Sequence, residues 1–283
     1  MTQSAGSASF RRSLRRAVRR RDCLALAVPP ALALAVFLLP TATKESLWFA
    51  YREPTLLTAY TSHFVHFDAE HLAANLLGYT LVAGLGYSLA ALAGYRRLYG
   101  TAAVTYVAAF PPVLSALNLA VPRDAVGYGL SGVNMAFAGL LGLVVVGYVD
   151  AVDGRIRLRH APGVFFAAVG IVAVVALPNG RTATAIAAAS ALVAAGYALA
   201  ARSAWHESAV TSVASGRWLD AGVLGVAAFL GYQFVGFPPV SSGGTVVNLY
   251  VHVVGLCLGF IVPYAALATG AVGGDADRGL LFG

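Results

Sequence analysis

Residues 131–149 read SGVNMAFAGLLGLVVVGYV and contain no charged side chain. A helix needs about 20 predominantly apolar residues to cross a bilayer. This run therefore predicts a transmembrane helix that begins at a serine, Ser131. Polar groups placed inside a membrane are costly and are functional candidates by default.

The whole chain has the same apolar character. Of its 283 residues, 59% are hydrophobic and 11% are charged, with a mean hydropathy of +0.75. A soluble domain carries roughly 25% charged residues. The composition predicts an all-α, polytopic membrane protein. The net charge of +7 does not call for a nucleic-acid partner, because the charges of a membrane protein follow its topology.

Apolar runs of spanning length predict the membrane topology. Pro29–Pro30 and Pro111–Pro112 should kink the first and third helices, since proline lacks a backbone N–H. We expect eight spans, at Leu24–Pro40, His71–Ala93, Leu98–Val121, Ser131–Val149, His160–Leu177, Thr182–Ala201, Leu219–Phe237 and Val246–Leu267.

Basic residues give these spans an orientation. With the N-terminus in the cytoplasm, 15 of the 19 Lys and Arg residues fall on the inner side and 4 on the outer side. Such an imbalance is typical of cytoplasmic loops. We therefore predict a multi-pass protein of the cell membrane with both ends cytoplasmic. The arginine run at 11–21 precedes an apolar helix and fits a topology anchor better than a signal peptide.

Three regions follow from this topology. Residues 1–22 form an Arg-rich cytoplasmic segment, residues 23–270 the transmembrane domain, and residues 271–283 a short cytoplasmic tail. The two cysteines, Cys23 and Cys257, are expected to be packing residues rather than a disulfide.

The predicted topology places four polar residues at one depth. His71 and Asn75 begin the second span, Ser131 begins the fourth, and His252 lies one to two turns into the last. All three spans start on the outer side. At 1.5 Å per residue, these groups lie within roughly 10 Å of the outer edge of the hydrocarbon.

These residue types suit acyl transfer. Ser131 can act as a nucleophile if a base takes its proton, and His252 is the candidate base. The two form a dyad, because neither helix carries an Asp or Glu near this depth. The free backbone N–H groups at the start of a helix can stabilise an oxyanion. His71 and Asn75 lie on one helical face and could donate to the same anion.

Small residues predict where two of these helices meet. Gly132-x-x-x-Ala136 and Gly255-x-x-x-Gly259 are small-xxx-small patterns, which allow helices in a membrane to approach closely. Packing of these two faces would bring His252 towards Ser131.

Together, these motifs resemble those of rhomboid intramembrane serine proteases. Residues 66–78, HFDAEHLAANLLG, look like the second-helix signature of that family. Gly129-Leu130-Ser131-Gly132 is similar to its nucleophile motif, and His252-x-x-Gly255-x-x-x-Gly259 to its last core helix. The resemblance implies a six-helix core with about two extra helices.

The resemblance also implies roles for individual residues. Ser131 would be the nucleophile and His252 the base, with His71 and Asn75 assisting the oxyanion. Gly129 belongs to the nucleophile motif, and His66 matches a family histidine whose role looks structural.

The chain departs from the family pattern in three places. Met135 stands where the family often has an aromatic residue packed on the catalytic histidine. Trp48 and Arg52 are near each other but not adjacent, as a Trp-Arg pair of the first outer loop would be. Ser131 and His252 lie 121 positions apart, which leaves open which of the three intervening helices borders the substrate entrance.

Two other functions remain as alternatives. One is a rhomboid-like protein that binds membrane helices without cutting them. The other is a metal site or transporter built on His63, His66, Glu70 and His71, since histidine suits zinc. The favoured interpretation requires no metal or cofactor. Its partners are transmembrane protein substrates and the lipid bilayer, and the sequence does not define the substrate or the oligomeric state.

Residues 236–244, rich in Gly and Pro, form either a movable cap or an ordinary turn.

Overall fold

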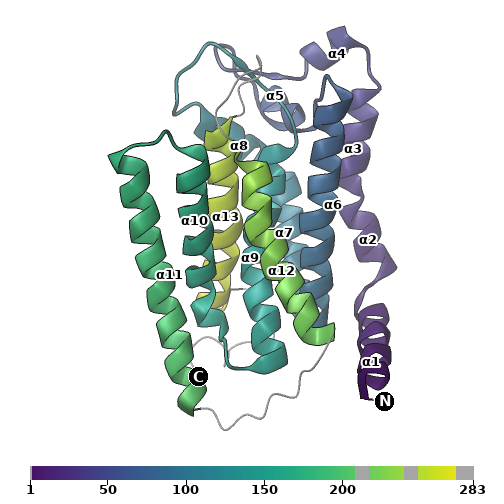
Figure 1. Ribbon diagram of the computed structural model, residues 1–283. Helices are drawn as coiled ribbons and strands as arrows, with labels where there is room; N and C mark the ends of the chain where they lie inside the picture. The colour runs from purple at the N-terminus through teal and green to yellow at the C-terminus, as the bar shows by residue number, and fades with distance from the viewer. Residues whose placement is uncertain (1, 208–216, 239–247, 272–283) are drawn as a thin grey trace.

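The computed structural model describes residues 2–207, 217–238 and 248–271. Of the predicted tail at 271–283, the structure describes only residue 271. Of the segment at 236–244, it describes only residues 236–238. Helices dominate the described chain (Figure 1). In order they are α1 (Thr2–Ala17), α2 (Arg20–Leu26), α3 (Val28–Phe37), α4 (Thr41–Glu45), α5 (Leu56–Thr61), η1 (Ser62–Phe64), α6 (Ala69–Leu92), α7 (Arg96–Ala108), α8 (Phe110–Asn118), α9 (Ser131–Asp153), η2 (Leu158–His160), α10 (Ala161–Ala176), α11 (Arg181–Glu207), α12 (Arg217–Gly236) and α13 (Leu249–Ala268).

Six of the described helices are long and apolar enough to cross a membrane. They are α6, α9, α12 from Trp218, α13, α11 as far as Arg202, and α10 together with η2. The pair α7 and α8 makes a seventh candidate, bent by 52° just before Pro111 and Pro112, where we expected a kink. The described chain is thus an all-α, polytopic helical protein.

The expectation of eight spans is corrected at the first one, Leu24–Pro40. Here the chain forms α2 and α3, which are 7 and 10 residues long and do not qualify as a span. The break falls at Ala27, and Pro29 and Pro30 occupy the first turn of α3. Proline is tolerated in a first turn but removes a hydrogen bond from a helix interior. The two prolines therefore end one helix and start another.

The three helices that carry the polar motifs start at the same end of the bundle. α6, α9 and α13 all run from the upper to the lower end in Figure 1. α9 is the central helix and packs against α6, α12 and α13. Within its apolar stretch of 18 residues, 83% is buried. Ser131 thus begins the best-protected helix of the fold.

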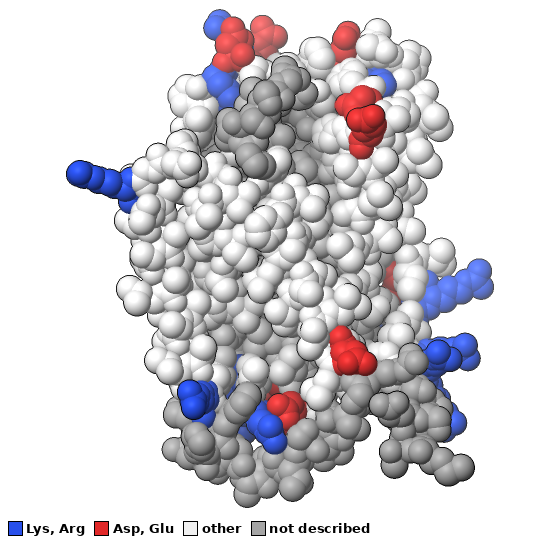
Figure 2. Space-filling view, in the orientation of Figure 1, with Lys and Arg blue, Asp and Glu red and all other residues white. Residues whose placement is uncertain are grey.

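On the face drawn in Figure 2, charged side chains are sparse between the two ends of the molecule. Figure 2 shows a broad, nearly uncharged belt between two ends that carry Lys, Arg, Asp and Glu. A hydrocarbon layer requires such a belt, because charges inside it are costly. The belt and the apolar helices together indicate a multi-pass membrane protein.

Small residues hold α9 and α13 in close contact. A Cβ atom added to Gly255 would strike the backbone carbonyl of Gly132, and one added to Gly259 would strike that of Ala136. A Cβ on Gly139 would in turn collide with the backbone of α13. The two predicted small-residue faces therefore meet, and backbone lies against backbone along about two turns.

A tyrosine compensates for the proline inside α13. Pro263 cannot donate to the carbonyl of Gly259, four residues earlier. The buried hydroxyl of Tyr106 on α7 donates to that carbonyl instead, at 2.6 Å. Proline is tolerated in membrane helices where neighbours satisfy the freed backbone group. This bond also ties α7 to the helix that carries His252.

Gly259→Ala is expected to destabilise the protein. Its methyl group would meet the backbone of Ala136, which cannot move aside without separating α9 from α13. Overpacking of this kind costs about 1–3 kcal/mol. Thermal unfolding in detergent measures the effect. Gly84→Ala on α6 is the control, since nothing lies within 4 Å of its added Cβ. Equal melting temperatures for the two variants would contradict the close contact.

Candidate active site

Ser131 is the first residue of α9 and is half-buried. No side chain caps this helix, and its first backbone hydrogen bond runs from the N–H of Asn134 to the carbonyl of Leu130, at 3.0 Å. The N–H groups that precede Asn134 in the helix have no partner within it. They lie beside the Ser131 hydroxyl at the positive end of the helix dipole, where negative charge is favoured.

Gly129 shapes the approach to Ser131. Its φ of +109° is a conformation that residues with a side chain rarely adopt, and its N–H donates to the carbonyl of Ser62 at 2.9 Å. A Cβ at this position would lie 2.9 Å from Cε1 of His71. Glycine is therefore required both for the turn and for the space that the His71 imidazole occupies.

His71 is held from two sides. The Asp68 carboxylate caps α6 by accepting from the backbone N–H of His71 at 2.6 Å, which fixes this residue in the first turn. The imidazole packs edge-to-face on that of His66, with ring centroids 4.9 Å apart. His66 is fully buried, and its Nδ1 donates to the carbonyl of Phe64 at 3.3 Å. His66 thus supports His71 from behind, as a structural residue would.

Asn75 lies one turn below His71 and is buried. Its Nδ2 donates to the carbonyl of His71 at 3.1 Å. Asn134, on α9, donates from its own Nδ2 to the backbone carbonyl of Asn75 at 2.9 Å and to its Oδ1 at 3.2 Å. The two asparagines thereby connect α6 to α9.

His252 lies in the first turn and a half of α13 and is 5% exposed. Its Nδ1 is hydrogen-bonded to the carbonyl of Gly236, the last residue of α12. A carbonyl oxygen only accepts, so Nδ1 carries the proton and Nε2 keeps a lone pair. A general base of this kind needs that tautomer. In this chain, a backbone group of α12 selects it.

Two buried residues hold the His252 imidazole and its carbonyl partner in place. Met135 is buried, and its Sδ lies against Gly236, where an added Cβ would be 2.5 Å away. Phe237, fully buried, packs edge-to-face on the His252 imidazole with centroids 5.9 Å apart. Met135 therefore supports the carbonyl that orients His252, and Phe237 supplies the ring contact.

A polar cluster fixes the start of α13. The Asn248 side chain caps the helix by accepting from the N–H of Val251 at 3.3 Å, and its Nδ2 donates to Asn118 and to the Tyr51 hydroxyl. Arg123 donates to Asn118 at 2.9 Å and stacks over the Tyr51 ring. Because Asn248 precedes His252 by one turn, the bonds that hold Asn248 also fix where His252 lies along α13.

The segments before the nucleophile are paired as well. β1 (Phe49–Ala50) and β2 (Val126–Gly127) form a short antiparallel pair, with Phe49 opposite Gly127. Arg52 forms an ion pair with Asp124 at 2.8 Å. Trp48, four positions before Arg52, packs on Phe67.

Ser131 and His252 lie on the two helices of the α9–α13 contact, each next to a residue that takes part in it. Gly132, next to the serine, lies against Val251, and Gly255 lies against the carbonyl of Gly132. Within the described part of the chain, no hydrogen bond joins Ser131 to His252. In free enzymes such bonds are often long and tighten only when substrate binds.

A second Ser–His pair, His63 and Ser115, lies elsewhere, and its hydrogen bond runs in the wrong direction for the histidine to act as a base. Nε2 of His63 is 3.1 Å from Oγ of Ser115, and both side chains are buried. The Ser115 hydroxyl donates to the carbonyl of Ala59 at 2.8 Å, so His63 must donate to Ser115 rather than accept from it. This pair joins η1 to α8 as a structural link.

The metal-site alternative gains no support from the geometry. Among residues 2–207, 217–238 and 248–271, no group of three or more His, Cys, Asp or Glu side chains is arranged to hold a metal ion. His63 bonds to Ser115, whereas His66 and His71 pack on each other.

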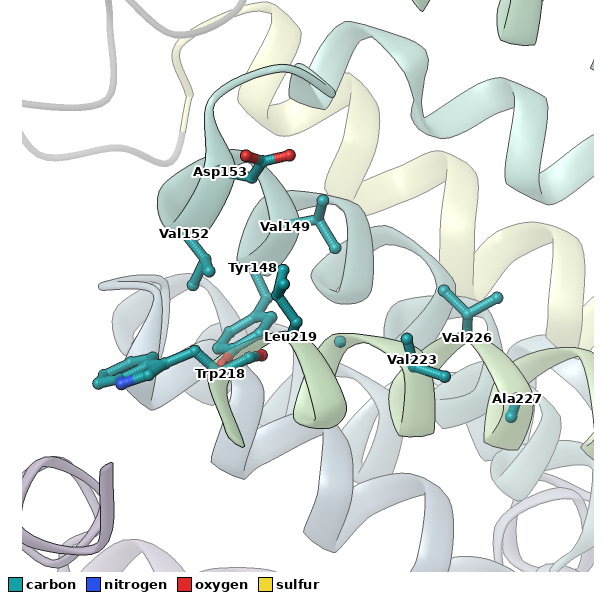
Figure 3. Close-up of a pocket in the computed structure, with 10 residues that line it drawn as sticks. Tyr148, Val149, Val152, Asp153, Trp218, Leu219, Val223, Val226 and Ala227 are labelled. Atoms are coloured by element: carbon teal, nitrogen blue, oxygen red, sulfur yellow. Dashed lines mark hydrogen bonds between the residues drawn. The ribbon is translucent and has the colours of Figure 1, made fainter. Parts of the chain in front are cut away.

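The groove drawn in Figure 3 lies far from these residues. It has a volume of about 470 Å³ and separates the last turns of α9, at Tyr148 and Val152, from the first turns of α12, at Trp218 and Val223. Tyr148 follows Ser131 by 17 positions, which is about 25 Å along a helix. The groove is lined almost entirely by apolar side chains and takes no part in the site.

Comparison with known proteins adds no assignment, since no family model, no curated protein and no solved structure matches the chain.

The stability of the protein is expected to fall between pH 6.5 and pH 4. Burial lowers the pKa of His63 to about 4, from 6.5 for an exposed imidazole. In this interval the unfolded chain binds a proton that the folded chain excludes, so the folded state loses stability as the pH falls. His63→Gln keeps a donor to Ser115 but does not titrate. Melting temperature measured against pH should fall less steeply in this variant, and identical slopes would contradict the prediction.

Proposed function

We propose that this protein is a serine-type intramembrane endopeptidase, resembling rhomboid proteases, that cleaves transmembrane segments near the outer face of the cell membrane. One observation carries the proposal. A serine at an uncapped helix start lies across the α9–α13 contact from the helix that carries His252, whose tautomer leaves Nε2 as an acceptor, and both helices belong to an apolar bundle. In this proposal both ends of the chain are cytoplasmic, which requires the broken pair α2–α3, drawn beside α6 in Figure 1, to carry the chain across the membrane as the eighth crossing.

The chemistry follows from the geometry. The Ser131 hydroxyl attacks the scissile carbonyl and passes its proton to Nε2 of His252, forming a tetrahedral oxyanion. Donors for that oxyanion are available at the start of α9, on Asn75 and on His71. His252 then gives the proton to the leaving amine, and water hydrolyses the acyl-enzyme by the same steps. Preorganised donors usually supply the largest share of such catalysis.

The packing of the extra helices supports a route for the substrate. α12 lies against both α6 and α9, and the Tyr232 ring of α12 fills the space above Gly78 of α6. α11 packs along α10, away from the site, and only 11% of its apolar stretch of 18 residues is buried. We therefore assign the lateral entrance to the seam between α6 and α12. The pair α10–α11 is then the addition to the six-helix core.

Ser131→Ala should abolish cleavage of single-span substrates and leave the melting temperature nearly unchanged, because a half-buried hydroxyl contributes little packing. His252→Ala should be equally inactive, since residues that act as one unit are not additive. Purified protein in liposomes, with a panel of single-span substrates, provides the assay. A serine-directed fluorophosphonate should label the wild type but not Ser131→Ala. Equal labelling of the two proteins would refute the assignment and leave a protein that binds helices without cutting them.

His71→Ala and Asn75→Ala should each lower kcat by roughly 10- to 1000-fold and change KM less. In this proposal both side chains donate to an anion that exists only during the reaction. Steady-state kinetics on the best substrate of the panel separates the two constants. If both variants keep the wild-type kcat, the pair is structural.

A further inference from the structure

Asn134 is a buried polar residue that neither the dyad nor the oxyanion donors account for. It follows Ser131 by three positions, so it lies one turn deeper on nearly the same face of α9. Its side chain is 1% exposed, and its Nδ2 contacts Asn75 twice, at the backbone carbonyl and at Oδ1.

These contacts fix the orientation of both amides. The backbone carbonyl of Asn75 only accepts, so the group of Asn134 that faces it must be the NH₂. The same NH₂ meets Oδ1 of Asn75, which turns the Nδ2 of Asn75 the other way, towards the carbonyl of His71. That carbonyl also only accepts. Two backbone carbonyls thus assign both amides without ambiguity.

The orientation leaves one donor of Asn75 unused. An amide NH₂ has two hydrogens, and the carbonyl of His71 takes one of them. If the Asn75 amide rotated by 180°, its oxygen would face the carbonyl of His71 and the anion site, and both contacts would be repulsive. Asn134 prevents this rotation by holding Oδ1.

Packing alone does not explain an asparagine at this position. Buried amides do join membrane helices, at an average of about 0.6 kcal/mol. The Oδ1 of Asn134, however, has no hydrogen-bond partner in the described part of the chain. An unpaired buried acceptor costs about 1–3 kcal/mol, which offsets that gain. Asn134 also contacts the Tyr232 hydroxyl on α12, but its two contacts with Asn75 are the ones that reach the candidate site, and they call for a functional explanation.

We propose that Asn134 is a positioning residue for the oxyanion site, holding the Asn75 amide so that an Nδ2–H faces the developing negative charge. This inference rests on the proposed protease function. Asn134 itself touches no reacting atom and acts through Asn75.

The test is a double-mutant cycle in kcat and KM. Asn134→Leu, similar in size but unable to donate, should lower kcat about 10- to 100-fold and leave KM within about twofold, the pattern of an interaction made in the transition state. Asn134→Ser, which is too short to reach Asn75, should do the same and covers the case in which leucine disturbs the fold. In an Asn75→Ala background, neither change should lower kcat further.

Gln233→Leu is the matched control. Gln233 on α12 is also fully buried, and its amide oxygen has no hydrogen-bond partner in the described part of the chain. Its amide nitrogen, Nε2, donates to the carbonyl of Phe229 in the same helix, at 2.7 Å. Its replacement should leave kcat unchanged, whatever it does to the melting temperature.

The outcomes separate the two proposals. If wild-type protein cleaves and Asn134→Leu keeps its kcat, or if the losses multiply in the double variant, the role of Asn134 is overturned while the protease function stands. If the wild type cleaves none of the substrates and fluorophosphonate labelling does not depend on Ser131, the protease function fails and the role of Asn134 fails with it.

Discussion

The contact between α9 and α13 is the constraint on which the rest of the structure depends. Gly255 and Gly259 let the backbone of α13 lie directly on that of α9, and Gly139 continues the contact from the other helix. In lipid, helices gain little from hiding apolar surface from one another, so close van der Waals contact and hydrogen bonds must hold them together. This contact fixes the distance between the helix that begins with Ser131 and the helix that carries His252.

Polar groups then refine what the glycines establish. Asn248 sets where α13 begins, Asp68 sets where α6 begins, and the Tyr106 hydroxyl satisfies the carbonyl that Pro263 leaves free. Each bond involves a helix end or a broken helix. These are the places where backbone groups lack partners, and in a membrane such groups are too costly to leave unpaired. The helix ends are therefore also the best-defined parts of the site.

The sequence was sufficient to predict the helical class, the positions of the spans from α6 onward, and the meeting of the two small-residue faces. Apolar length and glycine spacing are local properties, and they are visible in one chain. It failed at Leu24–Pro40, where two prolines divide a run that composition alone would join. The sequence also did not indicate the roles of Asn134 and Phe237, because their partners lie on other helices and no local pattern predicts such contacts. The carbonyl of Gly236 could not be found in this way, since every residue has one.

The bond from His252 to Gly236 has a consequence for timing. The imidazole takes its tautomer from a neighbouring helix, and that helix also lines the proposed entrance between α6 and α12. A substrate span that pushes α12 outward would withdraw the carbonyl and let the imidazole rotate. Under the proposed function, the imidazole would then lack its fixed orientation while a substrate is passing in, and would regain it only once α12 has closed again. Spans that leave before this closure would remain uncut, so the selection among substrates would be made by closure rather than by affinity.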